Sequence, residues 1–119
     1  MILNACTVTQ RSDLFFGMEI PGGGHVSTEQ WKNFSDSVIA KHFPEGSTEF
    51  DAKGKWFDPE KRRTISEDSK VVSFIGEKSK VRDRSLDTIM RTYAQKFNQQ
   101  AVMRVDSRLK RVMFVGDGW

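Results

Sequence analysis

Cysteine and histidine are scarce in this chain of 119 residues, which has one Cys and two His. A single cysteine cannot form an internal disulfide, and His25 and His42 stand at no metal-ligand spacing with Cys6 or with a pair of carboxylates. Long apolar runs are missing as well, since none approaches the roughly 20 residues of a membrane-spanning helix. The sequence therefore predicts no disulfide framework, no metal or other cofactor, and no transmembrane helix.

Aromatic residues, in contrast, are abundant. The chain has nine Phe and three Trp, and 37% of its residues are hydrophobic. A chain of this length and composition is expected to bury one core rather than to be disordered. We interpret Trp31, Trp56 and the phenylalanines most simply as members of that core. The net charge of +3 is too small by itself to indicate nucleic-acid binding.

Several segments have the alternation or the apolar composition of β-strands. We expect strands at about 13–20, 48–56, 70–75 and 102–106, with 112–115 as a continuation of the last strand or a short fifth one. The strand at 70–75 is apolar enough to be buried on both faces.

Two segments have the spacing of amphipathic helices. The first begins at Ser27, which forms a capping box with Gln30, and must end near Phe43 because Pro44 follows. The second covers about 82–98, with Asn98 as its C-terminal cap.

The resulting order β-α-β-β-α-β predicts a ferredoxin-like α+β sandwich, an antiparallel sheet with both helices on one face. Right-handed crossovers place the first strand between the third and the fourth. The other face of such a sheet is open, and here it would present aromatic and apolar residues. An exposed apolar sheet face marks a partner surface, so we expect a homodimer that packs sheet to sheet.

Four stretches carry a resemblance to a known family. They are FFGMEIPGGGHVSTEQWKNF, HFPEGSTEFDAKGKW, SEDSKVVSFI and YAQKFNQQAVMRVDS, in this order. Over residues of about 15–115 the chain resembles a family of small bacterial proteins catalogued as a domain of unknown function, many of whose members look like lipoproteins. The resemblance implies export, with a cysteine at the position of Cys6, and implies no activity. The ending RLKRVMFVGDGW is longer and more basic than the family pattern.

The residues Leu3-Asn4-Ala5-Cys6 read as a lipobox, the site at which bacterial lipoproteins are cut and lipidated. Only Met1 and Ile2 precede it, so the signal needs sequence upstream of Met1. The alternative is that Cys6 is a small buried hydrophobe. We expect a lipidated Cys6 and a tether or docking segment at 1–12 before a single domain at 13–119. The expected location is the periplasmic side of a bacterial envelope, with the cytoplasm as the alternative.

Three groups of residues are candidates for a site. A pocket for an anion could form at the glycine turn before the first helix, from Gly22, Gly23, Gly24, Ser27, Arg62 and Arg63. A basic patch gathers Lys78, Lys80, Arg82, Arg84, Arg108, Lys110 and Arg111. A catalytic cluster would use Arg104 to bind a carboxylate and Asp51 or Asp106 as general base. Each group also has an interpretation without a function, which the residues favour. The anion pocket would then be two solvated turns, the basic patch a solvated rim, and the catalytic cluster a structural Arg–Asp network.

The first functional hypothesis is a non-enzymatic binding module of the bacterial envelope that docks into a homodimer or a larger assembly. One alternative is a small enzyme of the dimeric α+β barrel type with a pocket on the sheet face. Another is a cytoplasmic binder of anionic small molecules. The expected partners are a protein or a second copy, and the membrane through Cys6. Nucleic acid is not expected, because no aromatic residues interleave the basic patch.

Overall fold

A computed structural model of the protein describes residues 7–118, so the predicted lipidation site Cys6 lies outside the described residues. The elements in chain order are β1 (Thr9–Gly17), α1 (Thr28–Phe34), the π-helical turn η2 (Ser35–Ile39), α2 (Ala40–His42), β2 (Thr48–Asp58), β3 (Arg63–Glu77), α3 (Lys80–Lys96) and β4 (Met103–Leu109). Among the described helices, none is long and apolar enough to cross a membrane.

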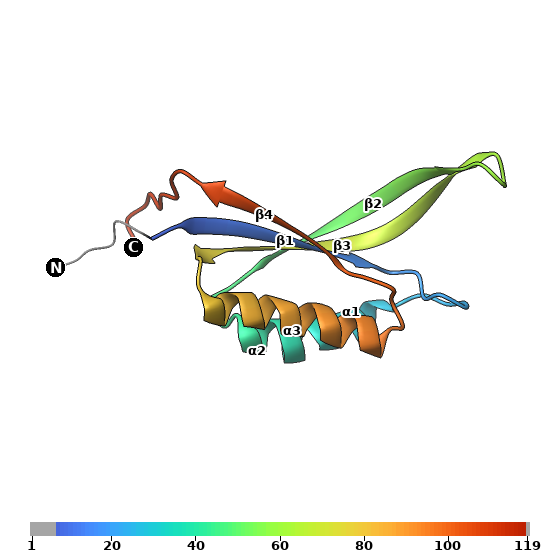
Figure 1. Ribbon diagram of the computed structural model, residues 1–119. Coiled ribbons are helices and arrows are strands. Elements are labelled where there is room, and N and C mark those ends of the chain that lie inside the picture. The colour runs from blue at the N-terminus through green and yellow to red at the C-terminus, as the bar shows by residue number, and fades with distance from the viewer. Residues whose placement is uncertain (1–6, 119) are drawn as a thin grey trace.

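The four strands form one antiparallel sheet in the order β2-β3-β1-β4. Figure 1 shows α1–α2 and α3 together on one side of this sheet. The ferredoxin-like prediction is confirmed, including the place of β1 between β3 and β4. Within residues 7–118, no helix covers the other side, which we call the open face.

Strand β1 begins at Thr9 and ends at Gly17, whereas the sequence predicted a strand at 13–20. Gln10 and Ser12 interrupt the apolar pattern, yet both side chains are buried on the helix side of the sheet. They are buried there because they contact the guanidinium of Arg82, described below. Residues 9–12 therefore belong to the sheet and not to a tether.

The segment after β1 folds back as a narrow turn, which we call the glycine turn (residues 20–25). Glu19 and His25 form a bridge across its base, and Val26 N–H donates to Met18 O over 2.8 Å. All three glycines have positive φ, from +93° to +125°, a region that side-chain-bearing residues rarely adopt. The last three residues of the predicted strand lie outside β1, at the base and start of this turn.

The hairpin of β2 and β3 extends beyond the helices, as Figure 1 shows. Its strands have 11 and 15 residues, compared with nine in β1. The prediction that β3 is buried on both faces is wrong, because Ile75 is 50% exposed on the open face. The aromatic residues of β2 are also exposed and outside the core: Phe50, Trp56 and Phe57.

The first helix begins as predicted, with a reciprocal capping box. Ser27 Oγ accepts from Gln30 N over 3.0 Å, and Ser27 N donates to Gln30 Oε1 over 2.9 Å. The π-helical turn η2 adds a residue to one turn of the helix, and Ile39 rather than Val38 is fully buried. The helix ends at His42, one residue before Phe43.

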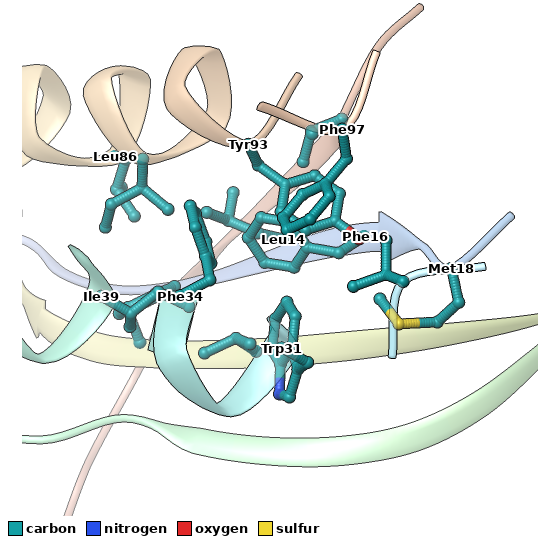
Figure 2. Packing of buried hydrophobic residues seen from close by; sticks show 14 of the residues in the cluster. Leu14, Phe16, Met18, Trp31, Phe34, Ile39, Leu86, Tyr93 and Phe97 are labelled. Carbon is teal, nitrogen blue, oxygen red and sulfur yellow. The ribbon is translucent and has the colours of Figure 1, made fainter. Parts of the chain in front are cut away.

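The core is an aromatic cluster between the sheet and the helices. Tyr93 lies at its centre, with ring centroids 4.8 Å from Phe16, 5.1 Å from Phe34 and 4.8 Å from Phe97. Its hydroxyl donates to Gly17 O over 2.6 Å, which satisfies a buried polar group. Figure 2 shows these rings between the helices and the sheet, together with Leu14 and Trp31.

Helix α3, the second helix predicted from the sequence, is followed by Asn98 in the left-handed conformation (φ 51°), as the predicted cap requires. The predicted strand at 112–115 is wrong. Residues 110–118 are described and contain neither helix nor strand.

Candidate functional site

A continuous row of apolar side chains crosses the open face. Phe50 of β2 pairs with Val71 of β3, Val71 with Phe15 of β1, and Phe15 with Met103 of β4. Directly paired residues of an antiparallel sheet point to the same side, so the four side chains form one line, which we call the apolar row. The two outer members are half-exposed, Phe50 at 47% and Met103 at 55%.

Further apolar side chains enlarge this surface, and a polar pair interrupts it. Ile75, Val105 and Trp56 point to the same side and are each 43–50% exposed. The polar pair is on β1, where Arg11 Nε donates to Asp13 Oδ1 over 3.0 Å. Arg11 is paired with Ile75 of β3 and Asp13 with Val105 of β4, so the ion pair lies between these two apolar residues. The part of the open face around the apolar row is therefore apolar and is interrupted by the ion pair of Arg11 and Asp13.

The helix side of the sheet has a polar centre around Arg82 of α3, whose side chain is only 7% exposed. Its Nε donates to Gln10 Oε1 over 3.2 Å, and its Nη2 contacts Ser12 Oγ and Phe74 O, each over 3.1 Å. The guanidinium also lies 5.9 Å from the centre of the Phe43 ring. Burial lowers the pKa of Arg82, but a guanidinium stays protonated at neutral pH.

The network continues to the surface through Asp106 and Arg104 of β4. Ser12 Oγ donates to Asp106 Oδ1 over 2.7 Å, and Arg104 Nε donates to the same oxygen over 2.9 Å. Arg104 Nη2 donates to Asp83 Oδ1 over 2.7 Å. Partial burial opposes ionisation of Asp106, but the hydrogen bonds from Arg104 and Ser12 outweigh it and lower its pKa.

These contacts bear on the predicted catalytic cluster. Arg104 and Asp106 are brought together, whereas Asp51 lies on β2 at the opposite edge of the sheet, where it pairs with Lys70. A lowered pKa makes Asp106 a weak proton acceptor. The structure thus brings two of the three predicted residues together, in an Arg–Asp network that also includes Ser12 and Asp83.

The basic patch is divided by the structure. Arg82 is buried in the network and does not contribute to a surface. The remaining members are exposed: Lys78, Lys80, Arg84, Arg108, Lys110 and Arg111.

The structure also places a cavity of about 500 Å³ beside the start of α1, which we call the α1 cavity. It is lined by Met18, His25, Val26, Ser27, Thr28, Trp31, Asp51, Ala52, Lys53, Asp68, Ser69 and Lys70. Of the residues predicted for an anion pocket, only Ser27 is in this lining. The three glycines lie in the glycine turn, and Arg62 and Arg63 lie at the far end of the β2–β3 hairpin. The structure thus does not bring the predicted set together.

Of the two lysines and two aspartates that line the α1 cavity, only Asp51 was singled out from the sequence, as a candidate general base. Lys53, Asp68 and Lys70 were not predicted for a site. Asp51 pairs with Lys70 and Lys53 with Asp68, each pair at directly opposed positions of β2 and β3. The available signal was the alternation Asp51-x-Lys53 in one strand and Asp68-x-Lys70 in the next. Reading it required the register of the hairpin, which the sequence alone does not provide. In the part of the chain that is described, no group of three or more metal-binding side chains lies together.

Two solved structures share this fold. Phage SAM lyase in complex with S-methyl-5′-thioadenosine matches with a TM-score of 0.61 and 11% identity, over 84% of this chain and 81% of that chain. Phage SAM lyase in the apo state matches with a TM-score of 0.62 and 12% identity, over 94% of this chain and 92% of that chain. At such low identity the likeness shows the fold alone.

Among the curated proteins, none matches this sequence. A family model does match, the one described as Protein of unknown function (DUF3574), and it covers residues 11–114. That range includes all of β2, β3, α3 and β4 and most of β1, together with the apolar row and the α1 cavity. The chain belongs to the family of proteins of unknown function DUF3574.

Proposed function

We propose that the protein is a binding module that associates with a second copy of itself through the open face. The observation that carries this proposal is the apolar row, which exposes Phe50 and Met103 at opposite edges of one sheet face. Removing such apolar surface from water contributes roughly 25 cal/mol per Å². A contiguous apolar patch of this kind is typical of a protein–protein interface.

The pattern beside the apolar row favours a second copy as the partner. On one side lie the small residues Ala52, Ser69 and Gly17, which pair with one another across the strands. On the other side lie Thr48, Ser73, Asp13 and Val105, and all of these but Ser73 are larger than the residues of the small side. A two-fold axis parallel to the row would place the small side of one copy against the large side of the other. Self-complementarity of this kind is what a two-fold interface requires.

Two phenylalanines of β2 provide a matched test. Phe50 is 47% exposed on the open face, and Phe57 is 60% exposed on the opposite face, because the two positions are seven apart in a strand whose side chains alternate between faces. Sedimentation equilibrium should show an oligomer for the native chain and for Phe57→Lys, and a monomer for Phe50→Lys. A native chain that is monomeric at all concentrations would contradict the proposal, as would equal effects of the two substitutions.

The location proposed for this module is the periplasmic side of a bacterial envelope, with Cys6 as the lipid anchor. The support is the lipobox pattern Leu3–Cys6. The test is expression from the native locus with its upstream sequence, followed by mass spectrometry of the mature protein. A lipidated Cys6 at the N-terminus, and release from membranes by Cys6→Ser, would support the anchor. An unmodified chain that begins at Met1 in the cytoplasm would overturn it.

The fold likeness favours a second candidate, a small enzyme. Both solved structures are of phage SAM lyase, and one contains S-methyl-5′-thioadenosine. The α1 cavity, on the helix side of the sheet, would be the place for a small substrate. The test is incubation of the purified protein with S-adenosylmethionine and chromatography of the products. Formation of S-methyl-5′-thioadenosine in proportion to enzyme concentration would support a lyase. Unchanged S-adenosylmethionine at stoichiometric enzyme would exclude it.

A further inference from the structure

The α1 cavity lies at the corner where the β2–β3 hairpin leaves the body of the protein. Its floor is the helix side of the hairpin, and its wall is formed by Met18, Val26 and the first residues of α1. In Figure 1 the hairpin and the segment between β1 and α1 both project beyond the helices at this end of the molecule. Its volume of about 500 Å³ is that of a small-molecule site.

The floor of the cavity carries four charges that alternate in sign. Lys70 Nζ donates to Asp51 Oδ1. The second pair lies two residues further along both strands, where Lys53 Nζ donates to Asp68 Oδ1 over 2.6 Å. The order of signs is reversed between the two pairs, so each strand contributes one cation and one anion. The pairs are separated by about 7 Å, the length of two residues in a strand.

The wall offers apolar surface. Met18, Val26 and Trp31 are 6%, 6% and 4% exposed, and all three line the cavity. The indole N–H of Trp31 is already engaged, since Nε1 donates to Glu49 Oε1 over 2.9 Å. Trp31 therefore presents the apolar part of its ring to a ligand rather than a hydrogen-bond donor.

The charge balance of the lining selects the class of ligand. The two lysines and two aspartates sum to zero, so a ligand with a single charge would find its counter-ion already paired with the opposite sign. A ligand that carries one positive and one negative charge can contact both ion pairs at once. Each charge of the ligand and of the floor then has an opposite charge beside it. Such a ligand needs a cation and an anion within a few ångströms and an apolar body that reaches the wall.

A free α-amino acid with an apolar side chain has these properties. We propose that the α1 cavity binds such a zwitterion. Its carboxylate contacts Lys53 and Lys70, its ammonium group contacts Asp51 and Asp68, and its side chain packs against Met18 and Trp31. This inference rests on the cavity of one chain and is independent of self-association and of lyase activity.

The test uses three probes with the same side chain. L-Phenylalanine is titrated into ¹⁵N-labelled protein, and its amide and its N-acetyl derivative, each of which lacks one charge, are titrated in parallel. The expected result is saturable movement of the Trp31 indole signal with L-phenylalanine, and affinity at least about ten-fold lower for each derivative, because each loses a charge-assisted contact. No saturable shift with L-phenylalanine, or equal affinity for the three probes, would overturn the proposal.

Substitutions in the floor locate the site. Asp68→Asn and Lys70→Met should each lower the affinity for L-phenylalanine about ten-fold or more, since each removes one of the two opposite charges that contact a charged group of the ligand. The matched control is Asp87→Asn, which breaks the exposed pair between Arg91 Nε and Asp87 Oδ2 (2.7 Å) on α3, outside the cavity. The control should bind like the native chain. Binding that is unchanged in both floor variants, or reduced equally in the control, would contradict this site.

Discussion

Arg82 Nη2 donates a hydrogen bond to Ser12 Oγ over 3.1 Å, although 70 residues separate the two in the chain. Ser12 in turn donates to Asp106, so one hydroxyl links α3, β1 and β4. Among the described residues, no buried side-chain nitrogen or oxygen lacks a hydrogen-bond partner. The polar groups at this end of the core are therefore satisfied by one another, and removing one should leave the others without partners.

The first prediction concerns this network. Arg82→Ala should lower the free energy of unfolding by about 3 kcal/mol, because Gln10 and Phe74 O lose a donor in a buried position. The matched control is Arg84→Ala on the exposed side of the same helix, for which about 0.5 kcal/mol or less is expected. Urea unfolding measures both values. Equal stability of the two variants would show that the network contributes little.

The second prediction concerns the start of the first helix. Ser27→Ala should lower the free energy of unfolding by about 1 kcal/mol through loss of the cap. Trp31→Ala should lower it by about 3–5 kcal/mol, because it empties a buried aromatic position. Trp31 is 4% exposed and 5.2 Å from the Phe16 ring. Thermal melts that rank Ser27→Ala as the less stable variant would contradict this order.

The third prediction is a pH dependence from Asp106. Its pKa in the folded protein is below the ordinary value of 3.8. Its carboxylate therefore stabilises the fold fully above that ordinary value, and this stabilisation is lost as the pH falls through the lower pKa of the folded state. The difference in unfolding free energy between the native chain and Asp106→Asn should be constant near neutral pH and shrink below pH of about 4. A difference that does not change with pH would contradict the assignment.

The fourth prediction uses Tyr93, the only tyrosine of the sequence. Burial raises its pKa, so its hydroxyl stays protonated in the folded protein at pH values where an unfolded tyrosine ionises. Absorbance at the phenolate band should not increase through pH of about 10 and should then rise together with the loss of circular dichroism. Stability should fall as the pH rises above the pKa of the unfolded state, because only the unfolded chain releases the proton there. An early phenolate signal in folded protein would contradict this.

Local signals in the sequence predicted the elements that depend on neighbouring residues. The capping box of Ser27 and Gln30 and the left-handed cap at Asn98 involve contacts within a few residues, so they formed where the pattern indicated. The position of β1 in the sheet followed from the order of elements and the handedness of crossovers. The end of the same strand was misplaced, since β1 ends at Gly17 and Glu19 pairs with His25 across the base of the glycine turn.

The sequence by itself determined the fold class, the order of the elements and the start of the first helix, because period and caps are properties of short segments and the handedness of crossovers follows from the order of the elements. Only the tertiary structure decided which polar residues are inside and which aromatic residues are outside. Gln10 and Ser12 are buried because Arg82 reaches them from another element, and Phe50 is exposed because no described helix covers its side of the sheet. The pairing of Asp51 with Lys70 and of Lys53 with Asp68 likewise depends on strand register. Such contacts join residues far apart in the chain, and their energy depends on a geometry that exists only once the chain has folded.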